Sequence, residues 1–299
     1  MNMDLIMYGL NGLPAWSAST FATEYRYATG GKGANQAMAV AKLGGQASMV
    51  GRVGDDENGR QLLRSLNGAG VDTRHVVVDG VENTGLSTMN MGEAGKYFSI
   101  YVPGANMAMR AEDLEAALSA DDFDMILMQL EMPRELVYHI CGIGSERGIP
   151  VFLDAGPAMR VPLEMLKGTL VISPNEAETQ ALTGIAPDSE ETIEAAARQI
   201  YEKASPKYVL LKLGGRGAYL YADGHGELSP GYRVDAVDTT AAGDTFSAAF
   251  CVEYCAGRSI GEAVRRAHAA AAICVTRKGG QASIPLREEA EAFFEERRG

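Results

Sequence analysis

The sequence has few cysteines, and none stands in a metal-binding spacing. Four occur in 299 residues, at Cys141, Cys251, Cys255 and Cys274. Cys251 and Cys255 would share a helix face, but no Cys-x-x-Cys pair and no suitably spaced histidine completes a zinc site. We therefore expect buried, reduced thiols rather than a zinc centre or a disulfide framework.

The sequence also lacks a long apolar run and an excess of basic residues. No apolar stretch approaches the roughly 18 residues of a membrane span, and the first ten residues contain Asp4 and no basic residue. The formal net charge is −12 and the sequence pI is about 4.9, which argues against binding a nucleic-acid backbone. We expect a cytoplasmic protein that binds neither membranes nor nucleic acids.

Three common active-site motifs are absent. The chain contains no GxxxxGK[ST] phosphate-binding loop, no GxGxxG after its first strand and no GxSxG nucleophile turn. These absences argue against a P-loop enzyme and an α/β-hydrolase. They also disfavour a dinucleotide-dependent oxidoreductase.

Short apolar runs alternate with amphipathic helical patterns along most of the chain. Such runs are typical of strands buried on both faces of a parallel sheet. The expected strands are 4–10, 47–54, 123–130, 149–156, 168–175 and 207–215. Helices are expected at 33–45, 55–70, 133–147, 175–183, 190–204, 242–257, 259–280 and 286–299, with Ser259 as an N-cap and Gly279 as a C-terminal break. The pattern predicts an α/β fold with a doubly wound, mostly parallel sheet, in a single domain that spans residues 1–299.

Two segments have a different residue composition. Residues 11–29 and 84–102 mix Thr, Tyr, Ser and Met, as antiparallel strands with one wet face do, and "GEAG" at 92–95 resembles a hairpin turn. We expect them to form a small β flap, or lid, at one edge of the main sheet.

Glycine clusters follow several expected strands, at 29–36, 213–219 and 241–246. Ligands of doubly wound sheets bind beyond the carboxyl ends of the strands, where glycine lets backbone N–H groups converge on an anion. The N–H groups of Ala241, Ala242 and Gly243 could form an anion hole with Asp244 beside it. Asp244 could equally be an ordinary acidic residue in a first helical turn.

Asn175 and Glu178 present a similar choice. Their spacing lets both hold water molecules around Mg²⁺, but it also fits a capping box at a helix start. From the residues alone we favour the cap.

Several longer motifs resemble the PfkB, or ribokinase-like, family of carbohydrate kinases. The paired signatures are "GGKGANQAMA" (30–39) and "DTTAAGDTFSAA" (238–249), in the family's order and about 200 residues apart. The likeness extends to "LMQLE", "PNEAETQALTGI", "LGGRGAY" and "HAAAAICVTRKGGQASIP". The resemblance implies a ribokinase-like fold, with Asp244 as catalytic base beside an anion hole formed by Ala241, Ala242 and Gly243.

The resemblance also implies a set of ligand contacts. The residues expected to bind the sugar are Gly31, Lys32, Gly33, Asn35, Glu131 and, less directly, Asn11. The residues expected to serve the nucleotide and Mg²⁺ are Asn175, Glu178, Lys212, Gly214, Gly215, Gly217, Gly243 and His268. Without the resemblance, Glu131 reads as an exposed acid at a helix start and His268 as a packed helical histidine.

Family members also bind a monovalent cation and associate through the lid. The positions that match the cation site are Asp238, Thr240, Cys274, Arg277, Gly279 and Ser283, and K⁺ is the cation expected. The resemblance further implies a homodimer formed through the lid.

One segment departs from the family pattern. The first strand of family members usually leads into G-S-x-N-x-D, where the Asp binds two sugar hydroxyls, whereas Leu13 stands where we look for that Asp. Trp16, the only tryptophan, lies in the same segment and could stack on a ligand, although we favour a plug in a shortened flap. We expect phosphoryl transfer from ATP to a pentose, with D-ribose first, another small sugar or a nucleoside second, and a non-catalytic sensor third.

Overall fold

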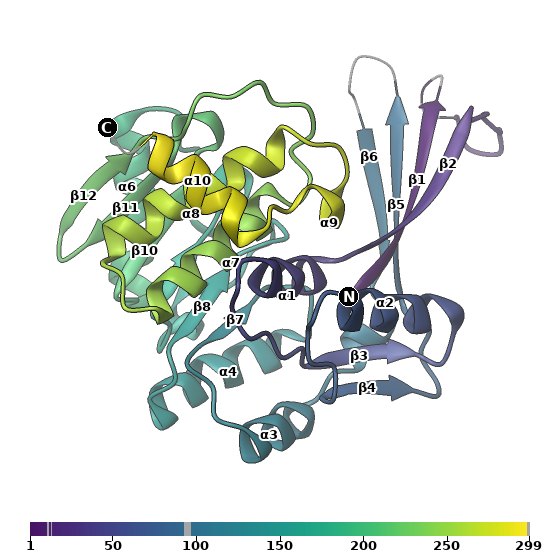
Figure 1. Cartoon of the computed structure of the whole chain (residues 1–299), viewed down its shortest axis with the longest axis horizontal. Coiled ribbons are helices and arrows are strands. Elements are labelled where there is room, and N and C mark those ends of the chain that lie inside the picture. Colours follow the sequence, from purple (N-terminus) through teal and green to yellow (C-terminus); the bar gives the residue numbers. More distant parts are fainter. Residues whose placement is uncertain (11, 13, 93–96, 298–299) are drawn as a thin grey trace.

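Helices and strands alternate along the chain in the computed structural model, which describes residues 1–297 apart from 11, 13 and 93–96 (Figure 1). The strands are β1 Asn2–Leu10, β2 Glu24–Gly30, β3 Gly51–Gly54, β4 Val76–Asp79, β5 Gly85–Gly92, β6 Tyr97–Val102, β7 Ile126–Met128, β8 Val151–Asp154, β9 Val171–Ser173, β10 Tyr208–Lys212, β11 Ala218–Ala222 and β12 His225–Ser229. The α-helices are α1 Lys32–Lys42, α2 Glu57–Gly68, α3 Ala111–Ala120, α4 Arg134–Arg147, α5 Glu176–Thr183, α6 Glu190–Ala204, α7 Ala242–Cys255, α8 Ile260–Val275, α9 Gly280–Ser283 and α10 Arg287–Glu296. In the described part of the chain, short 3-10 helices lie at Gly104–Ala108, Leu163–Leu166 and Gly214–Arg216.

The main sheet has six strands in the order β12-β11-β10-β9-β8-β7. The neighbours from β7 to β10 pair in parallel, and β11 and β12 add an antiparallel edge. The four parallel strands are those that the apolar runs predict. The hairpin of β11 and β12 was not predicted. The residues of β11 form only a short apolar run that overlaps the glycine cluster at 213–219, and β12 is polar and mostly exposed.

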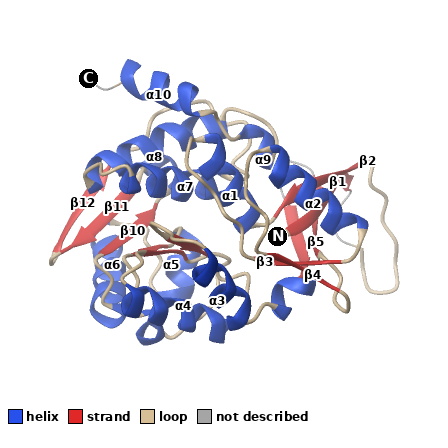
Figure 2. Ribbon diagram, turned by 60° about the horizontal axis from the view of Figure 1, so that its bottom comes forward, coloured by secondary structure: helices blue, strands red, loops and turns tan. Residues whose placement is uncertain are grey.

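Helices cover both faces of the main sheet, which confirms the doubly wound fold (Figure 2). Alternate residues of each strand point to opposite faces. Phe152 and Leu210 pack in one core cluster with α7 and α8, while Leu153 and Leu211 pack in another with α4 and α6.

A second sheet, here called the lid sheet, has four strands in the order β2-β1-β5-β6 and lies beside the main body (Figure 1). The sequence analysis placed only 11–29 and 84–102 in this sheet. In the structure β1 joins them, because it pairs antiparallel with β2 and parallel with β5. The turn expected at 92–95 falls mainly on residues outside the described part of the chain. The expected strand 47–54 is shorter, and as β3 it pairs with β4 in a separate two-stranded sheet.

Two helix boundaries test the capping predictions. The Ser259 side chain accepts a hydrogen bond from the Glu262 N–H, which confirms it as the N-cap of α8. Gly279 is not the end of α8. That helix stops at Val275, where the Thr276 hydroxyl donates to the Ile273 carbonyl (2.7 Å), and Gly279 (φ 92°) precedes α9 instead.

Two expectations about single side chains are wrong. All four cysteines are free, but Cys255 is exposed, whereas Cys141, Cys251 and Cys274 are buried. Trp16 is fully exposed, with a relative accessibility of 101%, so it plugs nothing in this structure. Among the described residues, no helix is long and apolar enough to cross a membrane.

Candidate active site

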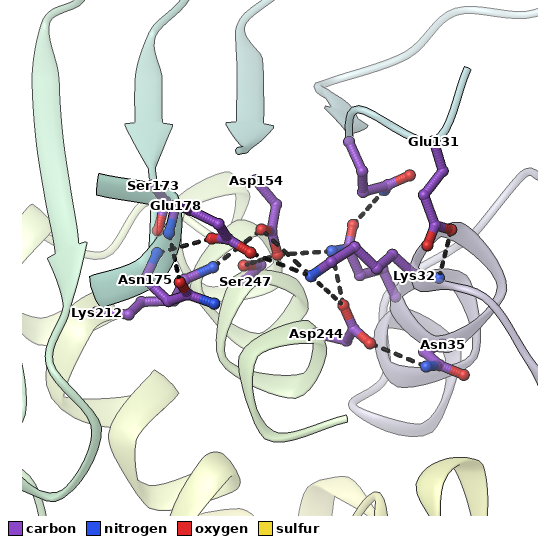
Figure 3. Close-up of polar contacts among 12 residues, drawn as sticks. Lys32, Asn35, Glu131, Asp154, Ser173, Asn175, Glu178, Lys212, Asp244 and Ser247 are labelled. Atoms are coloured by element: carbon purple, nitrogen blue, oxygen red, sulfur yellow. Dashed lines mark hydrogen bonds and ion pairs between the residues drawn. The ribbon is translucent and has the colours of Figure 1, made fainter. Parts of the chain in front are cut away.

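Polar side chains converge at the carboxyl ends of the main-sheet strands (Figure 3). Asp154 ends β8, Asn175 follows β9, and Lys212 ends β10. The first turns of α1 and α7 bring Lys32 and Asp244 to the same place. Residues from the two ends of the chain therefore meet at the strand edge where this fold binds ligands.

Asp154 is the fully buried carboxylate of the cluster. Its Oδ1 atom lies 3.0 Å from Lys212 Nζ and 3.7 Å from Lys32 Nζ, and its Oδ2 atom accepts from Ser247 Oγ (3.1 Å). Burial by itself raises the pKa of Asp154, but the charges of Lys212 and Lys32 outweigh it, and the pKa is lowered. Asp154 therefore stays ionised and holds both ammonium groups.

The Lys32 ammonium lies among three carboxylates. It is 3.7 Å from Asp154 Oδ1, 3.7 Å from Glu178 Oε1 and 3.8 Å from Asp244 Oδ1. Burial would lower the pKa of Lys32, but these negative charges raise it. Lys32 is thus a fixed positive charge at the centre of the site, and its backbone N–H donates to Glu131 Oε2 (3.0 Å). Glu131 does not start a helix, since α4 begins at Arg134.

Asp244 lies in the first turn of α7 and is 6% exposed. Its Oδ2 atom accepts from Asn35 Nδ2 (2.9 Å), and its Oδ1 atom accepts from Gln36 Nε2 (3.1 Å). Ordinary acidic residues of a first turn face water, whereas this carboxylate faces the residues of the other signature motif. Asp244 is thus an acidic residue of a first helical turn, as one interpretation expected, but one that is buried against the other signature motif.

The loop before α7 turns sharply at Ala241, which adopts the left-handed conformation (φ 63°). The Ala242 N–H donates to the Thr239 carbonyl at 3.2 Å, so one of the three expected anion-hole donors is engaged. A Cβ on Gly243 would lie 3.9 Å from Lys212 Nζ. The open backbone at Gly243 therefore faces a lysine, which suits a negatively charged ligand.

Asn175 and Glu178 form the predicted capping box of α5. The Glu178 N–H donates to Asn175 Oδ1 (2.9 Å), and the Asn175 N–H donates to Glu178 Oε2 (2.7 Å). Glu178 is nevertheless buried, and its other oxygen faces Lys32. Glu178 can therefore cap α5 and face the site at the same time. Among the described residues, no group of three or more His, Cys, Asp or Glu side chains could hold a metal ion directly. The Glu178 carboxylate and the Asn175 amide are oxygen donors, the kind of ligand that Mg²⁺ takes directly or through water.

The expected nucleotide segment forms a tight turn after β10. Gly214 (φ 55°) and Gly217 (φ 106°) take conformations that favour glycine, and Gly215 lies between them in the 3-10 helix. His268 lies on α8, where its ring packs 5.1 Å from that of Phe246, and it hydrogen-bonds to the backbone of Ser229, which lies against Gly217 of this turn. Burial lowers the pKa of His268 to about 4, and its Nε2 atom has no hydrogen-bond partner among the described residues.

The segments expected to bind a monovalent cation are joined by Asp238. Its two oxygens accept from the N–H groups of Thr240 and Gly279, each at 2.9 Å. Cys274 Sγ lies 3.0 Å from Ser283 Oγ. The Arg277 side chain turns away to Glu289 (2.6 Å), so only its backbone is available to a cation. These loops offer carbonyl and hydroxyl oxygens close together, and that donor set fits K⁺.

The carboxylate sought at Leu13 has a counterpart elsewhere. Asn11 and Leu13 lie outside the described residues, but Asn2 and Asp4 on β1 have the N-x-D spacing. Asn2 pairs with Gly30 in the register of β1 and β2, directly before Gly31 and Lys32. Burial raises the pKa of Asp4 to about 6, with further contributions from the charges of Glu131 and Asp244, while a hydrogen bond from Ser87 opposes the shift. Asp4 is therefore the residue of β1 that matches this carboxylate by its spacing, and its part in sugar binding belongs to the proposed function.

Sequence reasoning missed four side chains of the site. They are Asp4, Gln36, Gln129 and Asp154. Asp154 had a usable signal, because it is a charged residue at the end of the apolar run 149–156. Gln36 and Gln129 stand inside quoted motifs, but nothing in their spacing shows that they face each other.

The chain was compared with known proteins. The family described as pfkB family carbohydrate kinase matches residues 1–287. The ribokinase of Haemophilus influenzae is 36% identical over 276 residues, which cover 91% of this chain and 89% of that protein. A deoxyribokinase of Salmonella typhi is 34% identical over 297 residues, which cover 98% and 95%.

A solved structure agrees with these sequence comparisons. The Arabidopsis thaliana ribokinase, complexed with ribose and ATP, superposes with a TM-score of 0.89 at 34% identity and covers 98% of this chain and 95% of its own. The fold and the order of the motifs therefore agree with the resemblance seen in the sequence.

Proposed function

The chain belongs to the PfkB family of carbohydrate kinases, and we propose that it transfers the γ-phosphate of ATP to the primary hydroxyl of D-ribose. The observation that carries the proposal is the meeting of the two signature motifs, with Lys32 and Asn35 from the first against Asp244 from the second. The relatives named ribokinase and the complex of one of them with ribose and ATP support this substrate pair.

Asp244 acts as the base in this reaction. The sugar oxygen forms a bond to the γ-phosphorus while the bond from that phosphorus to the β-phosphate oxygen breaks, and ADP leaves. The hydroxyl proton passes to Asp244 late in the step, so the carboxylate chiefly orients the nucleophile. Lys32 and the N–H groups at Ala241 and Gly243 stabilise the negative charge on the phosphoryl group in transit.

The sugar lies between the lid sheet and the start of α1. Asp4, Asn35, Lys32 and Glu131 supply carboxylate, amide and ammonium groups for its hydroxyls, next to the bare backbone of Gly31 and Gly33. Such groups discriminate strongly against sugars that lack a hydroxyl, because a buried polar group is then left unpaired. Asp4 is the strongest addition to this pocket, since an ionised carboxylate can accept from two neighbouring hydroxyls.

ATP occupies the other side of Asp244. Lys212 and Gly243 lie beside the phosphates, the turn at 214–217 follows the nucleotide, and His268 lies near the adenine. Glu178 and Asn175 would hold Mg²⁺ through water, and the ion would supply positive charge that neutralises the phosphates.

The loops that contain Asp238, Thr240, Cys274, Arg277, Gly279 and Ser283 would hold K⁺. A cation there would stiffen the loop before α7 without contact to either substrate. Asp238 already joins the two segments, so a cation there adds to an existing contact.

We further propose a homodimer through the outer face of the lid sheet. Leu5, Met7, Tyr25 and Tyr27 line a hollow of about 380 Å³ on this face, and Tyr25 and Tyr27 are largely exposed. A second copy would cover these side chains, so sedimentation equilibrium should give twice the chain mass. A cytoplasmic location, expected from the sequence, stays a prediction.

One alternative substrate has direct support. The Salmonella typhi relative that covers 98% of this chain is named deoxyribokinase. 2-Deoxy-D-ribose is therefore the second candidate.

The test is ADP release from Mg-ATP with K⁺, measured across D-ribose, 2-deoxy-D-ribose, hexoses and nucleosides, with Asp244→Asn as the blank. We expect a D-ribose signal that falls by a factor of about 10² to 10⁴ in the variant while ATP affinity stays nearly constant. Near-normal turnover of Asp244→Asn would overturn the base assignment. A larger kcat/KM for 2-deoxy-D-ribose would transfer the proposal to that sugar.

A further inference from the structure

The Asp244 carboxylate receives an amide hydrogen bond on each of its two oxygens. Asn35 donates to Oδ2 (2.9 Å) and Gln36 donates to Oδ1 (3.1 Å), and both amides come from the first turns of α1 (Figure 3 shows the Asn35 contact). Gln36 Nε2 also donates to Asp154 Oδ2 (2.9 Å), so Asp154 helps to hold the direction of this amide. An ionised carboxylate can only accept hydrogen bonds. Each amide must therefore turn its NH₂ group toward Asp244 and its oxygen away from it.

A second glutamine holds each of these amides by its oxygen. Gln129, directly after β7, donates through Nε2 to Gln36 Oε1. Gln281, in α9, donates through Nε2 to Asn35 Oδ1 (3.2 Å). All four amide side chains are buried, with exposed fractions between 1% and 8%, so water does not replace these contacts.

The outer amide of Gln281 is itself fixed in direction. Its Oε1 atom accepts from Thr29 Oγ1 (2.6 Å) and from Ser65 Oγ (3.4 Å), which leaves its NH₂ group to face Asn35. Lys42 Nζ donates to the Gln281 backbone carbonyl (2.8 Å) and anchors α9 against α1. Reversal of this amide would break contacts at both of its ends.

We propose that Gln129 and Gln281 are positioning residues that fix the directions of Gln36 and Asn35, so that both amides always donate to Asp244. The inference rests on the proposed role of Asp244 as the base. Reversal of Gln36 or Asn35 would place a carbonyl oxygen against the carboxylate and remove a hydrogen bond to its ionised form. The base would then be protonated at a higher pH, and the orientation of its carboxylate would be less well defined.

The other charged groups around Asp244 come from several elements and stay unchanged when Gln129 or Gln281 is replaced. They are Lys32 from α1, Asp154 from β8, Glu178 from α5, Lys212 from β10, Asp4 from β1 and Glu131 after β7. A shift of the pH profile in such a variant therefore reports on the amides.

The experiment measures kcat/KM for the sugar between pH 5 and 9 in Gln129→Met, Gln281→Met and the double variant. Methionine has a similar length and no hydrogen-bonding amide. In Gln281→Met the Asn35 amide becomes free to reverse, whereas in Gln129→Met the Gln36 amide is still held through its Nε2 atom by Asp154. We expect the acid limb to move to higher pH and kcat to fall by a factor of about three to ten in Gln281→Met and by less in Gln129→Met, with little change in the KM for ATP. Gln129→Glu and Gln281→Glu should move the limb further, both because a carboxylate can only accept and so favours the reversed amide and because each change adds a negative charge near Asp244. The methionine variants add no charge, so they carry the test.

Gln61→Glu is the matched control, since Gln61 is exposed on α2 and the same change there should leave the profile unshifted. An acid limb that stays in place in folded methionine variants would overturn the proposal. Loss of the fold in all variants would also overturn it, because the glutamines would then be structural supports. If Asp244→Asn keeps its turnover, the base assignment itself fails. If Asp244→Asn loses turnover but the glutamine variants behave like the unchanged enzyme, only the positioning role fails.

Discussion

The carboxylate of Asp4 lies against the α-carbon of Gly30, so a Cβ added to Gly30 would overlap Asp4 Oδ2. Asp4 belongs to β1 and Gly30 is the last residue of β2, one residue before the turn into α1. The absence of a side chain at Gly30 is what lets a carboxylate of the lid sheet approach the start of α1.

Gly30→Ala should therefore weaken sugar binding by displacing Asp4. We expect the KM for the sugar to rise about tenfold while the KM for ATP changes little, because the displaced carboxylate serves only the sugar side. Steady-state kinetics with each substrate varied separately would measure both constants.

Gly142→Ala is the control for this change. Gly142 lies inside α4 with open space around its α-carbon, so the same substitution should stabilise the helix by about 0.5–1 kcal/mol and leave both constants unchanged. An equal effect of the two substitutions on sugar KM would contradict the role of Asp4.

Asp4→Asn should stabilise the protein at neutral pH and weaken sugar binding. The pKa of Asp4 is about 6 in the folded protein and near 3.8 when unfolded, so its stability contribution is present below pH 4 and is lost as the pH rises through 6. Asparagine does not titrate. In urea unfolding, the free energy of unfolding of the variant should exceed that of the unchanged protein by about 1–3 kcal/mol at pH 8, and the two values should be nearly equal at pH 4.

The sugar KM of Asp4→Asn should rise about tenfold or more, since the amide accepts through only one oxygen. A variant that binds the sugar normally would remove Asp4 from the pocket even if the stability result holds.

His268→Phe should reduce the loss of stability in acid. The pKa of His268 is about 4 in the fold and 6.5 when unfolded, so its contribution is present above pH 6.5 and is lost as the pH falls through 4. Phenylalanine keeps the ring packing against Phe246 and has no proton to bind. In the unchanged protein this titration lowers the free energy of unfolding by about 3 kcal/mol between pH 6.5 and 4. We expect urea unfolding of the variant to lack that decrease.

His225→Phe provides the comparison, because His225 is exposed on β12. If both variants show the same dependence on pH, burial does not control the titration of His268.

Asp238→Ala should impair activation by K⁺. Without the carboxylate, the N–H groups of Thr240 and Gly279 lose their shared acceptor, and the two loops are no longer joined. Titration with KCl at constant ionic strength should show a half-maximal concentration raised about tenfold. An unchanged titration curve would argue against a cation between these loops.

The sequence predicted the parts of the fold that depend on local pattern. The four parallel strands appeared as apolar runs, and the starts of α5 and α8 were visible in Asn175, Glu178 and Ser259. Pairing between distant segments left no such pattern. The place of β1 in the lid sheet depends on its register with β2 and β5, so Asp4 was overlooked and its counterpart was sought at Leu13.

The candidate site was predicted unevenly for the same reason. Motifs identified Lys32, Asn35, Glu178 and Asp244, but they did not show that Lys32 lies nearly midway between three carboxylates. Asp154 makes closer ionic contact with Lys212 than any of these residues makes with Lys32. It went unnoticed because the hydrogen bonds that give it importance come from α1 and α7.

β1 and β2 pair in the register that places Asn2 opposite Gly30, and β2 leads directly into α1. The lid sheet and the start of α1 at the candidate site are therefore consecutive parts of the chain. Gly31 alone separates the last residue of β2 from Lys32, and a Cβ there would meet the backbone of Asn2. In the proposed function, a sugar bound to Asp4 would pull on a strand pair that ends one residue from Lys32. Sugar binding and the position of Lys32 at the phosphate site would then be coupled through Gly31.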